Sequence, residues 1–211
     1  HALLQQLLRI HACIRDRQEL TPDKRKECTV SWNQVLQAHL EAGMPGRVKE
    51  LWDENNRRKR ERKSSVLRDE GSFSILLQSL AATRVPDVPT KALERAKQAH
   101  SILQKMISFD PASRLFQPSA EHFASVMEAW SRSYHLDAAN FNQQLMDRLL
   151  QESERNADMA PSAAHYNALI ISWGYSRSPH AFRNVLRTFD LARVSGTRFD
   201  LRSFAAVLLA L

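Results

Sequence analysis

The sequence has little glycine, little cysteine and no long apolar run, and each shortage excludes a class of protein. Its 211 residues include only 5 glycines, and none of them form a glycine-rich loop that could cradle a phosphate. The 2 cysteines, Cys13 and Cys28, lack the spacing of a metal site, so we expect reduced thiols in a reducing compartment. No apolar run reaches the roughly 18 residues that would suggest a membrane span.

Signatures of catalysis and metal binding are also missing. The sequence contains no His-x-x-x-His, Cys-x-x-Cys or His-Glu-x-x-His pattern, and no Ser, His and Asp constellation stands out. His122 and His165 occupy equivalent places in two different segments, so they are not expected to converge on one ion. We therefore expect no metal, no cofactor and no enzyme activity.

What is abundant favours helices and an anionic partner. Leu, Ala, Arg, Gln, Glu and Lys are frequent, β-branched residues are sparse, and no stretch alternates with the period of a strand. This composition predicts an all-α fold. The net charge of +7 and the pI of about 9.8 favour polyanionic partners such as RNA, DNA or an anionic membrane, although many organellar proteins are also basic.

The chain repeats itself. Pro-Ser-Ala-Glu-His-Phe at 118–123 is followed by Pro-Ser-Ala-Ala-His-Tyr at 161–166, an offset of 43 residues. Each aromatic is followed seven residues later by a tryptophan, Trp130 or Trp173, with apolar residues at the third and fourth positions between. That spacing places four large side chains on one stripe of a helix. A repeat of this length is typical of solenoids, which more often bind than catalyse.

The same spacing recurs at five aromatics, each of which predicts a first helix: Trp32, Phe73, Phe123, Tyr166 and Phe204. In the first copy His39 replaces the apolar residue seven positions on. Second helices are predicted over 47–61, 91–108, 136–152 and 180–194, with turn residues between the helices of each pair. The pattern predicts a right-handed α-solenoid of helix-turn-helix repeats, in which each pair buries its aromatic stripe against the next.

We expect 1–28 to be the N-terminal helix of a preceding repeat or a cap, and Thr21-Pro22-Asp23 to be a break. The array then occupies 29–211, in units of about 29–69, 70–119, 120–162 and 163–200 with a partial unit at 201–211. We also expect the chain to be a segment of a longer protein, with any targeting peptide outside it.

The first helices resemble those of pentatricopeptide repeats. Residues 31–36 read Ser-Trp-Asn-Gln-Val-Leu and residues 165–170 read His-Tyr-Asn-Ala-Leu-Ile, similar to the Thr-Tyr-Asn-Thr-Leu-Ile-like string that opens the family's unit. Residues 196–200 are similar to its closing turn, with Phe199 in place of proline. The units here are longer than the family's, so the resemblance is to a divergent member. Tetratricopeptide-like repeats are the rival, but their small-residue signature fits less well.

The pentatricopeptide resemblance implies binding of single-stranded RNA, one base per unit, through a few side chains. The residues that match the family's reading positions are Asn33, Asp69, Ser74, Ser119, Asn167 and Asp200. The pairs Asn33 with Asp69 and Asn167 with Asp200 resemble the family's uracil-reading pair. Because Ala124 and Ala205 interrupt the series, contact with the RNA backbone, or protein packing in a larger particle, is favoured over reading adjacent bases. The alternative role for these polar residues is helix capping.

A cationic run offers the clearest candidates for phosphate contact: Arg57, Arg58, Lys59, Arg60, Arg62 and Lys63. Such a cluster can pair with RNA phosphates and release counterions. A solvated helix end, whose dipole favours cations, would have the same composition, and so would a nuclear-import signal.

The resemblance implies an organellar protein, mitochondrial or alternatively plastid, that acts in RNA metabolism or translation. We expect organellar rRNA or mRNA as the partner, together with neighbouring proteins of a ribonucleoprotein such as the mitochondrial ribosome. The alternative function is a tetratricopeptide-like protein–protein scaffold without RNA contact. A scaffold groove should respond less to salt than an RNA-binding surface.

Overall fold

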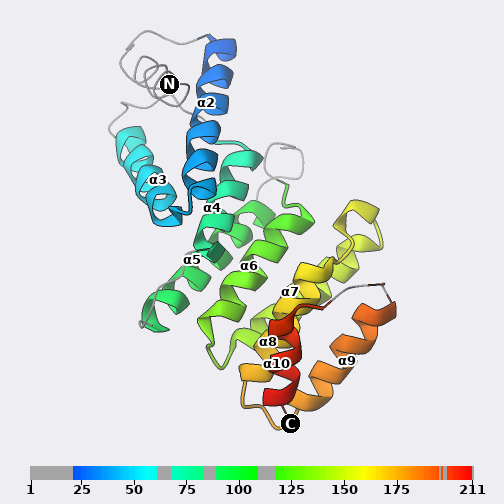
Figure 1. Ribbon diagram of the computed structural model, residues 1–211. Helices are drawn as coiled ribbons and strands as arrows, with labels where there is room; N and C mark the ends of the chain where they lie inside the picture. The colour runs from blue at the N-terminus through cyan, green and yellow to red at the C-terminus, as the bar shows by residue number, and fades with distance from the viewer. Residues whose placement is uncertain are drawn as a thin grey trace. The chain divides into compact units, whose positions relative to one another are not determined.

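The computed structural model describes residues 21–60, 68–82, 89–108, 117–194, 196 and 199–210, and every regular element in these ranges is helical (Figure 1). The predicted all-α class is therefore confirmed. The helices fall into two compact units, the first holding α2 to α4 and the second α5 to α10. Their bounds are α2 Pro22–Glu41, α3 Pro45–Arg60, α4 Glu70–Ala82, α5 Pro89–Ser108, α6 Ala120–Ser133, α7 Ala138–Ser153, the 3₁₀ turn η2 Ala157–Met159, α8 Ala163–Tyr175, α9 Ala181–Val194 and α10 Leu201–Leu209.

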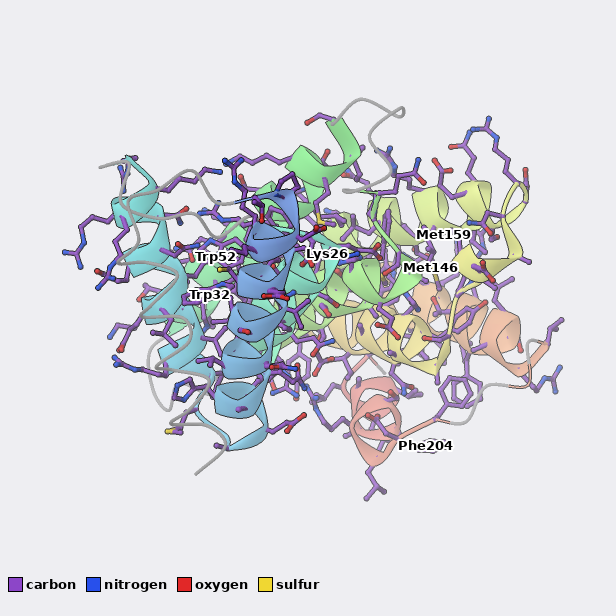
Figure 2. All side chains as sticks on the ribbon, turned by 90° about the horizontal axis from the view of Figure 1, so that it is seen from above. Lys26, Trp32, Trp52, Met146, Met159 and Phe204 are labelled. Carbon is purple, nitrogen blue, oxygen red and sulfur yellow. The ribbon has the colours of Figure 1, made fainter. Side chains whose placement is uncertain are left out.

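In the first unit, α2 and α3 form an antiparallel hairpin and α4 packs on both. The turn depends on Gly43, whose φ of +72° suits a residue without a side chain. Trp32 and Trp52 are buried between α2 and α3, as Figure 2 shows. Phe73 of α4 meets Trp52 edge to face, with ring centroids 5.4 Å apart. Three first-unit aromatics thus share one core.

One predicted boundary is wrong. We expected a break at Thr21–Pro22 and the array to begin at 29, but α2 begins at Pro22, so residues 22–28 belong to this helix. Thr21 and Pro22 do not end a helix here but begin one. The Thr21 side chain caps α2, and a proline is favoured in the first turn of a helix. The rest of the expected N-terminal segment, 1–20, lies outside the described residues. The continuous array predicted over 29–211 stays a prediction.

In the second unit, the 43-residue repeat extends to individual hydrogen bonds. The hydroxyl of Ser133 donates to the Trp130 carbonyl at 2.7 Å, and Ser176 does the same to Trp173 at 2.8 Å. The next residue has a left-handed backbone in both copies, with φ of 50° at Tyr134 and 53° at Arg177. The turns after α6 and α8 are thus the same structure.

The two tryptophans also bond alike. The indole of Trp130 donates to His100 Nδ1 of α5 at 3.2 Å, and that of Trp173 to Gln143 Oε1 of α7 at 3.3 Å. In each case the acceptor lies 30 residues earlier, on the helix before. Phe141 of α7 stacks on Trp130 with ring centroids 4.3 Å apart. The first helices α6 and α8 are therefore each fixed to the preceding helix by a buried, hydrogen-bonded indole.

The aromatic residues that mark the predicted first helices differ in burial. Phe123 and Tyr166 are buried, Phe73 is half-buried, and Phe204 is 49 % exposed (Figure 2). The expectation that every stripe is buried is therefore wrong for α10. This helix packs on α8 through its small residues, Ser203 and Ala206, which turns Phe204 partly outward.

Three expectations that rest on what the sequence lacks can be set beside the structure. Cys28 is buried and disulfide-bonded, so the expected reduced thiol is wrong and cysteine use does not argue for a reducing compartment. No described helix combines the length and apolar character needed to cross a membrane. In the same ranges no three His, Cys, Asp or Glu side chains gather as a metal-binding group.

Candidate nucleic-acid interface

Four first helices begin with the same polar device, which pairs the capping residue with a residue three positions later. In α4 and α10 the cap is an aspartate and its partner a serine. Asp69 Oδ1 accepts from the amide and the hydroxyl of Ser72, both at 2.8 Å. Asp200 Oδ1 accepts from the amide and hydroxyl of Ser203, again at 2.8 Å. These bonds satisfy amides that a helix start leaves without partners.

In α6 and α8 the cap is a serine and its partner a histidine. The backbone amide of Ser119 donates to His122 Nδ1 at 2.9 Å, and that of Ser162 to His165 Nδ1 at 3.0 Å. Because Nδ1 accepts in both rings, the neutral imidazole carries its proton on Nε2. The helix-capping alternative is therefore correct for Asp69, Ser119 and Asp200.

The partner residue also reaches back to the preceding first helix. Ser72 donates to Asn33 Oδ1 of α2 at 2.6 Å, and Ser203 donates to Asn167 Oδ1 of α8 at 2.8 Å. His165 Nε2 donates to the Ala120 carbonyl at the start of α6 at 2.9 Å. In α4, α8 and α10, one residue thus pairs with the cap of its own helix and also bonds the preceding first helix.

These contacts bring together two of the predicted reading pairs. Asn33 Nδ2 donates directly to Asp69 Oδ1 at 2.9 Å, whereas Asn167 and Asp200 are joined through Ser203. The serines that join the pairs were missed by sequence reasoning. The signal that could have found them is the shared pattern Asp-x-x-Ser-Phe, which stands at 69–73 and 200–204.

The other two residues at predicted reading positions, Ser74 and Ser119, lie in different units. Ser74 is half-buried in α4 of the first unit, and Ser119 caps α6 in the second. Their joint role in base reading stays a prediction.

The Asn33 site is anionic and preorganised. Burial alone would raise the pKa of Asp69, but hydrogen bonds from Asn33 and from Ser72 outweigh it and hold the pKa below its usual value. One N–H and one lone pair of the Asn33 amide are used in this network, which leaves one of each for an outside partner. The single Ser72 hydroxyl proton can serve Asn33 or Asp69 at one time, so the acceptors compete for it.

The predicted phosphate-contact residues lie at the end of α3. Arg57 to Arg60 form its last turn, where the helix dipole favours cations, while Arg62 and Lys63 lie outside the described residues. Glu54 pairs with both Arg57 and Arg58, the latter at 2.7 Å. Lys59 and Arg60 are exposed and pair with no carboxylate in the described part of the chain.

The hairpin brings further cations to this end, which sequence reasoning missed. Lys26 lies 15 residues before the end of α2 (41 − 26), and Arg60 lies 15 residues after the start of α3 (60 − 45). At about 1.5 Å of rise per residue, both stand about 22 Å from the turn that joins the helices. Figure 1 shows the start of α2 and the end of α3 at the same end of the hairpin.

We call this surface the basic hairpin end, and its members are Lys24, Arg25, Lys26, Arg57, Arg58, Lys59 and Arg60. The described carboxylates there are Asp23, Glu27 and Glu54, so seven positive charges meet three negative ones, an excess of four. Lys24 to Lys26 were missed because their distance in sequence from the α3 run conceals their proximity in the fold.

Comparison with known proteins does not indicate a function for this surface. No protein-family model matches the chain, and no curated protein shows significant similarity to it.

Proposed function

We propose that this protein binds RNA through the phosphates, at the basic hairpin end. The observation that carries the proposal is the excess of four positive charges that two helices bring together, on side chains that are exposed except for the half-buried Arg58. Cations placed in this way neutralise phosphates and release condensed counterions, which favours binding independently of base sequence. The chain acts by binding and has no catalytic role in this proposal.

The proposed architecture is a right-handed solenoid of divergent pentatricopeptide-like hairpins. It is supported by the contacts of Ser72, His165 and Ser203, each of which links a first helix to the first helix before it. Repeated contacts between neighbours are what stabilises such arrays.

The proposed setting is a mitochondrion, or alternatively a plastid, where the protein acts in RNA metabolism or translation. Within it, the chain is part of a large ribonucleoprotein such as the mitochondrial ribosome, in contact with rRNA or mRNA and with neighbouring proteins. This rests on the pentatricopeptide resemblance and on the basic charge of the chain.

In this proposal, recognition of bases contributes less to RNA binding than contact with the phosphates. Asn167 and Asn33 each keep donors and acceptors for a base, but alanines at the equivalent positions 124 and 205 cannot hydrogen-bond one. We propose that backbone contact provides most of the affinity and that the two asparagines add a local preference for pyrimidines.

A protein–protein scaffold is the second candidate, and exposed apolar residues favour it. They lie on the last two described helices: Phe182, Leu186, Leu191, Val194, Leu201, Phe204, Leu208 and Leu209. Apolar surface of this kind commonly marks contact with another protein.

The test replaces four exposed cations of the basic hairpin end with glutamine, at Lys24, Lys26, Lys59 and Arg60. Affinity for a single-stranded RNA is then measured at fixed salt, and we expect it to fall at least tenfold. A matched control replaces four exposed cations elsewhere, Lys105, Arg155, Arg187 and Arg193, and lowers the net charge equally. Equal losses in both variants would mean that net charge, not this surface, determines binding. Unchanged affinity in the first variant would refute the proposal.

A further inference from the structure

Two exposed tyrosines meet where α6 and α8 end. Tyr134 follows the last residue of α6 and is 52 % exposed, and Tyr175 ends α8 and is 38 % exposed. Their ring centroids lie 4.6 Å apart in an edge-to-face pair. The pair therefore keeps ring surface in water, whereas Trp130 and Trp173 nearby in the sequence are buried.

Guanidinium groups border this pair. Arg202 of α10 lies close enough to Tyr134 to interact with its hydroxyl, and Arg202 Nη1 lies 3.2 Å from Glu128 Oε1. Arg132 of α6 reaches the same carboxylate oxygen, with its Nε at 2.5 Å. Two cations thus share one carboxylate, which leaves one positive charge beside the rings. All three side chains remain partly exposed.

Arg202 is held beside the rings by an ion pair with Glu128. Burial alone would lower the pKa of Arg202, but the Glu128 carboxylate, and after it the nearby Tyr134 hydroxyl, raise it above its usual value. An aromatic surface with a fixed guanidinium beside it is the arrangement that proteins use to hold an unstacked base and its phosphate.

We propose that Tyr134 and Tyr175, with Arg202 and Arg132 beside them, form a stacking site for an unpaired base of single-stranded RNA. The proposal deepens the RNA-binding function above and rests on it. Every base has a π-face, so this site accepts any base and differs from reading through Asn167. Arg202 then takes the phosphate next to the stacked base, in exchange for part of its contact with Glu128.

The experiment compares two ten-nucleotide RNA backbones of equal charge, one carrying uracils and one abasic. Stacking of one base predicts that the intact chain binds the uracil strand about 5- to 150-fold more tightly than the abasic strand. Tyr175→Leu should reduce this ratio strongly, whereas Tyr134→Phe, which keeps the ring, should preserve most of it. Phe182→Leu is the matched control, because Phe182 has the same exposed fraction as Tyr175, 38 %, and lies outside the site. It should leave the ratio unchanged.

The outcomes separate this inference from the proposed function. If both strands bind with equal affinity, RNA binding stands and the stacking site is refuted. If neither strand binds, both proposals fail. Should a tyrosine variant not fold, ultraviolet crosslinking of the unmodified protein to the uracil strand provides the second measurement. Crosslinked peptides containing Tyr134 or Tyr175 would support the site, and crosslinks confined to other peptides would overturn it.

Discussion

At the residue scale, the third position of each first helix is the most informative. Ser72, His122, His165 and Ser203 all precede the aromatic directly, and each pairs with its cap. The pair is Asp with Ser in α4 and α10 and Ser with His in α6 and α8, and in every pair a donor meets an acceptor. Sequence reasoning gave helix capping as an alternative role for these polar residues. It missed that their partners also bind the neighbouring helix, because that contact depends on tertiary packing.

Two histidines, the buried His165 and the half-buried His100, predict a dependence of stability on pH. Burial lowers the pKa of His165 and His100 below the ordinary 6.5, although hydrogen bonds at His165 act in the opposite direction. Below about pH 6.5 the unfolded chain therefore binds more protons than the folded chain. The stability associated with the two neutral histidines is therefore fully present above about pH 6.5, and it is lost as the pH falls through their folded-state pKa.

We thus expect the free energy of unfolding to fall between pH 7 and pH 5, measured by urea denaturation. The variant carrying His100→Gln and His165→Gln should show a flatter profile over that range. An identical slope in the variant would contradict the assignment of these two rings as the titrating groups.

Asn167 tests base reading at a single residue. Asn167→Ala removes the acceptor of the Ser203 hydroxyl, which should cost about 1 kcal/mol of stability. It should also relax a preference for pyrimidines, measured as the affinity ratio between oligouridylate and oligoadenylate. An unchanged ratio would remove Asn167 from base recognition while leaving phosphate binding untouched.

At the scale of elements, the sequence predicted most helices to within a few residues. The expected second helices 91–108 and 180–194 correspond to α5 Pro89–Ser108 and α9 Ala181–Val194. Their 3.6-residue periodicity is strong because one face of each is buried. The start of α2 failed because a proline can begin a helix as readily as it can end one.

The contact between α8 and α10 predicts a packing effect. A Cβ atom at Gly174 would lie 2.5 Å from the Ala206 carbonyl oxygen, too close for atoms of a backbone that cannot easily move. Gly174→Ala should therefore cost about 1–3 kcal/mol of stability through overpacking. Gly46→Ala is the control, because nothing lies within 4 Å of its Cβ position, and it should cost nothing. Equal stabilities for the two variants would contradict the close approach.

The indole contacts predict a second effect on packing. Trp130 is 1 % exposed, stacks on Phe141 and donates to His100. Trp130→Ala should cost about 3–5 kcal/mol by leaving a cavity, as measured by chemical denaturation. A loss below about 1 kcal/mol would mean that the repeated indole does not hold α5, α6 and α7 together.

At the scale of the whole molecule, the sequence predicted the basic charge of the protein but only part of the basic surface. The run from Arg57 was evident because its members are consecutive. The contribution of Lys24 to Lys26 became evident only from the structure, in which α2 and α3 are antiparallel and the start of α2 lies at the same end of the hairpin as the end of α3 (Figure 1). The proximity of Asn33 and Asp69 could be predicted by aligning the repeat units with one another. For Ser74 and Ser119 the same alignment is less certain, because the units differ in length.

The salt dependence of RNA affinity tests the central claim most directly. For single strands, the logarithm of the binding constant should fall with the logarithm of the salt concentration by about 0.7 for each neutralised phosphate. Replacing Lys24, Lys26, Lys59 and Arg60 with glutamine should therefore make the slope shallower by up to about 3, whereas replacing Lys105, Arg155, Arg187 and Arg193 should leave it unchanged. If the first replacement leaves the slope of the parent protein intact, the basic hairpin end does not bind RNA phosphates.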